Sequence, residues 1–169
     1  FFFFTRAAVS DELREDRPYA IGSVAALPFS LINPDEDLGA MAEGLHEELL
    51  TTLSEFNPLD VVSRSSVLQY REIRPTVPEM GVSLGADYLI EGSIQMADTK
   101  TRVTLQLIEA TTDKHIWAET FDSEEDKSES ALRFQKELAF ELAIRAYQQL
   151  KEENPLSGKA KELFEQRMA

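Results

Sequence analysis

The sequence contains no cysteine and only two histidines among its 169 residues. The lack of cysteine excludes disulfide bonds, thiolate metal sites and cysteine nucleophiles. The histidines, His46 and His115, lie far apart in the sequence, and His46-Glu47 is not followed by the second histidine of an H-E-x-x-H zinc motif. We therefore predict no metal site and no bound cofactor.

Motifs that mark common enzyme families are also missing. There is no phosphate-binding G-x-x-x-x-G-K-[ST] loop, no G-x-G-x-x-G after a strand and no G-x-S-x-G elbow. We predict that the chain is not an enzyme and name no catalytic residue. Glu43, Glu47 and His46 form the densest ionisable cluster, so a hydrolase that uses them stays as a second alternative function. The simpler interpretation is a solvated acidic helix face.

Positive charge is scarce, since 17 Lys and Arg stand against 31 Asp and Glu, giving a net charge of -14. Such an acidic chain repels phosphate backbones, and its basic residues are spread along the sequence. We therefore predict no nucleic-acid partner.

Apolar runs long enough to cross a bilayer are absent as well, although the sequence starts with the apolar residues Phe1–Phe4. Four residues cannot cross a bilayer, which needs about 20 apolar residues. The run is either an arbitrary boundary or the end of a transmembrane helix. We interpret residues 1–18 as a juxtamembrane or linker segment, so the membrane is a partner only through an N-terminal anchor.

The first half of the chain predicts a parallel β-α-β unit. Residues 20–29 form a nearly continuous apolar run, which is typical of a central strand covered on both faces, and Pro28 ends that strand because it has no backbone donor. Residues 34–56 carry apolar positions at three- and four-residue spacing and predict a helix, and residues 59–64 predict a second strand. Short connections between them favour parallel pairing of the two strands.

The segment that follows predicts short helical structure. Residues 65–72 fit a helical turn or a loop, while Thr76 and Glu79 have capping-box spacing before a helix that Gly85 ends. Gly81 weakens the helix by about 1 kcal/mol relative to alanine.

Residues 86–122 change to a period of two, with polar turns near residues 97–100 and 111–113, and predict an antiparallel meander of three strands. A long helix is predicted over residues 127–151. The fold class is therefore α/β, with a mixed sheet of about five strands and helices packed on it. Residues 19–151 form this domain.

The long helix carries more apolar surface than one sheet face needs. Its apolar positions cover more than half of the helical wheel, whereas a single sheet face needs an arc of about 100°. The excess predicts a second partner, either another subunit or a further helix. We select Phe140, Ile144, Tyr147 and Trp117 as interface residues. The simpler interpretation of Trp117 is a core position beneath the helix.

A small-ligand pocket is the first alternative function. Arg64, Ser65 and Ser66 follow the second predicted strand, at the edge of the sheet where α/β proteins often bind ligands. Arg64 could hold a carboxylate or phosphate, with Glu47 nearby. The plainer interpretation pairs Arg64 with Glu47 or Glu48 and uses the serines as a helix cap.

Five segments carry a family resemblance in order: AALPF, AEGLHEELLTTL, VVSRSS, LGADYLIEGSI and VTLQLIEATTDKHIWAETFD. Together they resemble the TolB N-terminal-like domain of bacterial regulators, over roughly residues 20–150. The resemblance implies an anticodon-binding-like α/β fold. It also implies a place between a membrane anchor and tetratricopeptide repeats, with an adenylate cyclase or winged-helix output domain.

The resemblance shapes the expected function. We expect a non-enzymatic sensory or interaction domain of a membrane-tethered bacterial regulator, acting through a protein partner or through self-association. We expect a periplasmic location at the inner membrane, with a cytoplasmic one as the alternative. Residues 152–169 predict a helix, and KAKELFEQRMA within it is similar to one helix of a tetratricopeptide repeat.

Overall fold

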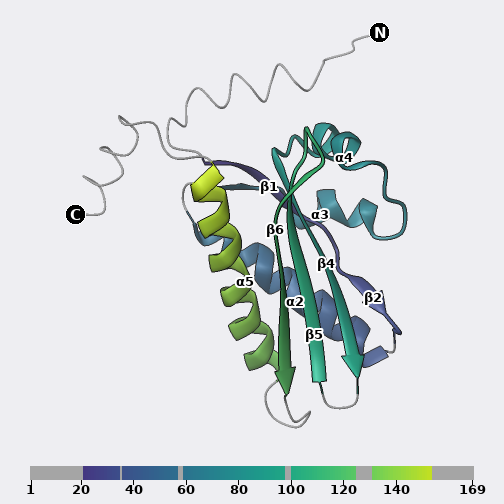
Figure 1. Ribbon diagram of the computed structural model, residues 1–169. Coiled ribbons are helices and arrows are strands. Elements are labelled where there is room, and N and C mark those ends of the chain that lie inside the picture. Colours follow the sequence, from purple (N-terminus) through teal and green to yellow (C-terminus); the bar gives the residue numbers. More distant parts are fainter. Residues whose placement is uncertain (1–20, 35, 57–58, 98–99, 125–130, 154–169) are drawn as a thin grey trace, which may run out of the picture.

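A computed structural model describes most of the predicted domain and shows a mixed sheet with helices on both faces (Figure 1). The described residues are 21–34, 36–56, 59–97, 100–124 and 131–153. The predicted linker, the phenylalanine run and the predicted helix beyond residue 153 lie outside these ranges, so those predictions stay predictions.

The described residues form six strands and several helices. The strands are β1 (Gly22–Ala26), β2 (Ser30–Ile32), β3 (Leu59–Val61), β4 (Tyr88–Ala97), β5 (Lys100–Glu109) and β6 (Lys114–Glu124). The helices are α2 (Glu36–Glu55), α3 (Arg64–Val67), the 3-10 turn η1 (Leu68–Tyr70), α4 (Val77–Leu84) and α5 (Ala131–Glu153).

The strand order β3-β1-β4-β5-β6 confirms the predicted fold class. β1 pairs in parallel with both β3 and β4, as expected for a β-α-β unit. β4, β5 and β6 form the predicted antiparallel meander. Residues 64–70 are helical, which settles the choice between a helical turn and a loop.

The strand predicted from the apolar run ends before Pro28, as expected, but the sequence did not predict the second strand that follows it. β1 stops at Ala26, and a separate strand, β2, pairs in parallel with β4 further along the same edge. Pro28 lies between them and has no backbone N–H to donate to a sheet. β4 therefore has two short partners on one side, and the sheet has six strands instead of about five.

The inner face of the sheet is covered by both long helices. α2 and α5 lie along the same face (Figure 1), and their apolar residues form one core with those of β1, β4 and β5. In α5, Leu142, Ala143 and Ala146 are fully buried. Most of the excess apolar surface of α5 is therefore satisfied by a further helix, which was one of the two expectations, and that helix is α2.

The outer face of the sheet carries a smaller core. Ala25, Leu27 and Leu89 pack there against buried side chains of α3, η1 and α4, including Val67 and Met80. β1 is thus covered on both faces, as its apolar sequence predicted.

The ends of α4 follow the predicted capping pattern. The Thr76 backbone N–H donates to the Glu79 carboxylate at 2.9 Å, and Gly85 ends the helix with φ 62°. Gly81 permits a close approach, because a Cβ there would lie 2.6 Å from Cβ of Ala110.

Two helical glycines give opposite stability predictions. Gly81→Ala gains helix propensity but overlaps Ala110, so we expect a loss of about 1–3 kcal/mol in the free energy of unfolding. Gly39→Ala in α2 meets no atom within 4 Å, so we expect a gain of up to about 1 kcal/mol. Urea unfolding of both variants measures the difference. Equal effects of the two substitutions would contradict the close packing of α4 on the β5–β6 turn.

Candidate functional site

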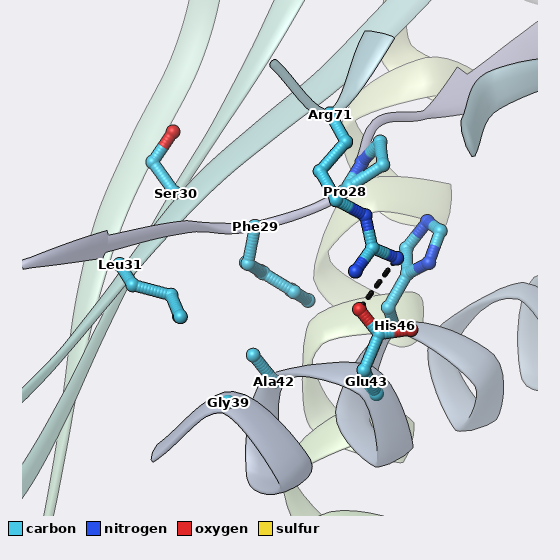
Figure 2. A pocket seen from close by; sticks show the side chains of 9 residues that line it. All are labelled: Pro28, Phe29, Ser30, Leu31, Gly39, Ala42, Glu43, His46 and Arg71. Carbon is cyan, nitrogen blue, oxygen red and sulfur yellow. Dashed lines mark ion pairs between the residues drawn. The ribbon is translucent and has the colours of Figure 1, made fainter. Parts of the chain in front are cut away.

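A pocket of about 440 Å³ lies where the break between β1 and β2 faces the first half of α2 (Figure 2). Its apolar lining residues are Pro28, Phe29, Leu31, Gly39 and Ala42. Its polar lining residues are Ser30, Glu43, His46 and Arg71. The volume falls in the range that small-molecule sites occupy, about 300–1,000 Å³.

The apolar side of the pocket depends on small residues opposite larger ones. Figure 2 shows Phe29 and Leu31 extending from the β1–β2 segment toward Gly39 and Ala42 on α2. The Phe29 ring lies so close over Gly92 of β4 that a Cβ at position 92 would overlap it. Glycine at position 92 therefore leaves room for the ring on this face of the sheet.

An ion cluster forms the polar side. One Glu43 carboxylate oxygen pairs with Arg64 and the other with Arg71, each at 2.6 Å. Figure 2 shows the Arg71 guanidinium directed at Glu43 from across the pocket. The side chains of Glu43, Arg64 and Arg71 are 38–46% exposed, so solvent screens these ion pairs and each adds little stability by itself.

His46 closes the back of the pocket and is 2% exposed. Its Nε2 lies 2.9 Å from the carbonyl oxygen of Ala26. A carbonyl only accepts, so Nε2 carries the proton and donates it. Burial lowers the pKa of His46 below its usual value, and its hydrogen bond to Ala26 opposes this only in part. The ring is therefore neutral near pH 7.

Arg74, which lies between η1 and α4, binds the segment that joins β1 and β2. Its Nη2 donates to the carbonyl oxygen of Pro28 at 2.5 Å, and its Nε donates to that of Tyr70 at 3.2 Å. The Leu27 N–H donates to the Ile90 carbonyl at 2.8 Å. With the bond from His46, the carbonyls of Ala26 and Pro28 and the N–H of Leu27 all have partners.

Two buried polar atoms beside the cluster have no hydrogen-bond partner among the described residues, namely Nδ1 of His46 and Nε of Arg64. Neutral His46 makes Nδ1 an acceptor, and Nε of Arg64 is a donor. Buried polar atoms are usually paired with protein or water. The described residues therefore leave two buried polar atoms near Glu43 without a hydrogen bond.

The structure places the predicted ligand residues apart from this pocket. Arg64 pairs with Glu43, not with Glu47 or Glu48, and Glu47 is exposed on α2. The hydroxyls of Ser65 and Ser66 lie 3.2 and 3.0 Å from that of Ser63. None of Glu47, Arg64, Ser65 and Ser66 lines the pocket, although Arg64 touches it through Glu43.

The three residues of the hydrolase alternative do not act as one group. Glu43 and His46 line the pocket, but Glu47 is not among the lining residues. His46 does not lie on a solvated face, because Ala26 and Phe29 bury it; its ring stands edge-on to Phe29 with centroids 6.3 Å apart.

The predicted interface residues divide between surface and core. Phe140 is 56% exposed. Ile144 and Tyr147 are half-buried, and the Tyr147 ring stacks on Phe56 with centroids 4.6 Å apart. Trp117 is partly buried against the inner core, opposite Leu107 of β5, which agrees with its alternative core position.

Sequence reasoning missed Arg71, Phe29 and Arg74. A signal for Arg71 was present, since it follows Arg64 by seven residues, a spacing that places two side chains on one helical face. Phe29 carried none, because its role depends on Gly92, which is 63 residues away in the chain.

The described residues contain neither a metal-binding cluster nor a membrane-spanning helix. No group of three or more His, Asp or Glu there is arranged to hold a metal ion. None of the helices of the described segments is both long enough and apolar enough to cross a membrane.

The chain is similar in sequence to a family of transcriptional regulator domains and to a putative adenylate cyclase. The family described as "HilA/YgeH-like transcriptional regulator, second domain" matches residues 20–140. A putative adenylate cyclase 3 from Rhizobium meliloti (strain 1021) is 36% identical over 100 residues, which are 59% of this chain. The match spans only 17% of the length of that relative.

Two solved structures share the fold. Lipoprotein GNA1162 from Neisseria meningitidis has a TM-score of 0.54 and 16% identity, covering 73% of this chain and 96% of that one. TolB from Acinetobacter baumannii has a TM-score of 0.50 and 15% identity, covering 76% of this chain and 28% of that one. The TolB-like fold expected from the sequence is confirmed.

The buried His46 predicts a pH-dependent stability. Its folded-state pKa is below the unfolded value of about 6.5, so the unfolded chain binds a proton more readily. The stability from neutral His46 is complete above about pH 6.5 and is lost as pH falls toward the folded pKa. We expect the free energy of unfolding, measured in urea, to decline between pH 7 and 5.5.

His46→Gln is the test variant, because an amide nitrogen can replace Nε2 as donor to Ala26 but does not titrate. It should remove the slope, whereas His115→Gln, at an exposed site, should keep it. The carboxyls of Glu79 and Asp122, whose pKa values are lowered, contribute only near pH 4 and below. An unchanged slope in His46→Gln would contradict the assignment.

Proposed function

The chain belongs to the family of HilA/YgeH-like transcriptional regulator second domains, and on this premise we propose that it is a non-enzymatic sensory and interaction domain of a membrane-tethered bacterial regulator. The share of the adenylate cyclase relative that it matches supports a role as one module of a longer protein. We place it on the periplasmic side of the inner membrane, which the fold shared with a lipoprotein supports. Tetratricopeptide repeats after residue 152 complete the proposed arrangement.

The observation that carries the interaction role is the position of Phe140. Single exposed apolar side chains are common on protein surfaces, whereas a contiguous patch of them marks an interaction site. Phe140, which is 56% exposed, is followed along α5 by two half-buried apolar side chains. Phe140, Ile144 and Tyr147 recur at i, i+4 and i+7, which places them on one strip of α5. We call this the α5 strip. α2 and the sheet bury the apolar side chains of α5 from Leu138 to Leu150 that lie outside this strip.

The occupant we propose for the α5 strip is a second copy of the chain. A two-fold interface uses the same surface on both subunits, so one exposed phenylalanine contributes twice. Two copies with net charge -14 repel each other. Salt screens such repulsion beyond about 10 Å at 0.1 M. Self-association should therefore strengthen as ionic strength rises.

The hydrolase alternative has less support. A catalytic carboxyl needs a free oxygen near the substrate, and both Glu43 oxygens are held by arginines. Buried His46 already donates its Nε2 proton to the backbone.

Phe140→Lys tests the α5 strip. We expect the mass from sedimentation equilibrium to rise with concentration for the original chain and to stay monomeric for Phe140→Lys. The unfolding midpoint should change little, because the side chain is mostly exposed.

Val82→Lys is the matched control, because Val82 is 82% exposed on α4 and the substitution makes the same change of charge. It should associate like the original chain. A chain that stays monomeric up to millimolar concentration in 0.5 M salt would refute self-association, as would equal effects of Phe140→Lys and Val82→Lys.

A further inference from the structure

The pocket at the β1–β2 break combines an apolar wall with an excess of one positive charge. Glu43 offers one negative charge to Arg64 and Arg71, and His46 is neutral. The cluster is therefore left with about one positive charge, in a chain whose net charge is -14. An anion bound in this pocket would neutralise the remaining positive charge of the cluster.

Arg71 is the side chain able to hold such an anion. It lines the pocket and its side chain is 46% exposed. A guanidinium has five N–H donors, and the contact with Glu43 uses Nη2. Planar donors of this kind match the two oxygens of a carboxylate. The charge excess of one favours a monoanion over a phosphate dianion, which would leave the cluster negative.

The opposite wall selects the rest of the ligand. Phe29 and Leu31 face α2 across the cavity, where Gly39 and Ala42 leave space (Figure 2). This wall offers no charged partner, so it suits a short apolar chain or ring. A volume of about 440 Å³ accommodates a carboxylate with about five to eight carbons together with water.

We propose that this pocket binds a small organic monocarboxylate, with its carboxylate on Arg71 and its apolar part between Phe29 and α2. The proposal concerns a ligand site and does not depend on the self-association proposed for the α5 strip. The ligand would contact the β1–β2 segment and α2 together.

The test is an NMR titration of the ¹⁵N-labelled 169-residue chain with three probes. These are sodium hexanoate, neutral hexanamide and inorganic phosphate. We expect hexanoate to shift the amide signals of Phe29, Leu31 and Gly39 and to bind at least tenfold more tightly than hexanamide. Phosphate should bind more weakly than hexanoate, because it cannot use the apolar wall.

Three variants separate the two parts of the site. Arg71→Gln should weaken hexanoate binding about tenfold or more. Arg102→Gln is its matched control, since Arg102 is an exposed arginine paired with Asp122 outside the pocket, and it should bind like the original chain. Gly39→Leu should fill the pocket and abolish binding while its unfolding temperature stays at or above the original, because a Cβ there meets no atom within 4 Å and leucine favours a helix more than glycine does.

Several results would overturn the proposal. They are absence of hexanoate binding, equal affinity for hexanoate and hexanamide, tighter binding of phosphate, and a Gly39→Leu variant that binds normally. Equal losses in Arg71→Gln and Arg102→Gln would point to a general charge effect and would overturn it too.

Discussion

The break at Pro28 is the constraint on which the rest of this structure depends. Pro28 has no N–H to donate, and it interrupts the strand that begins at Gly22. β4 therefore pairs on this edge with two separate strands, β1 and β2. Each backbone group released by the break needs a partner. His46 from α2 and Arg74 from the α4 side supply two of them, so the break ties both helical layers to the sheet.

The pocket follows from the same break. Residues 27–29 separate β1 from β2, and the Phe29 ring lies over Gly92 of β4. Small residues of α2 face it, and the cavity remains between them. Arg71 then reaches Glu43 across the opening. A ligand there would contact the sheet, α2 and the segment after η1, which is an arrangement that suits the sensory role we propose for the domain.

The packing of α5 shows how far an apolar pattern can be interpreted. The wide apolar arc indicated two partners correctly, but it did not identify them. α2 and the sheet cover most of that arc, and Tyr147 stacks on Phe56 of the same chain. Among the apolar α5 side chains that the structure describes, Phe140 remains exposed. Periodicity shows how much of a helix is buried, whereas the partner depends on how the elements cross in space.

The sequence by itself determined the local elements: a buried β1, the α2 helix, the capped α4 and the three-strand meander. Apolar period, capping residues and turn chemistry are properties of neighbouring residues, so they are visible in one dimension. Tertiary structure decided the second short strand, the pairing of Arg64 with Glu43 instead of Glu47, and the pocket. These depend on residues such as Phe29 and Gly92 that lie far apart in the chain, and only folding brings them into contact.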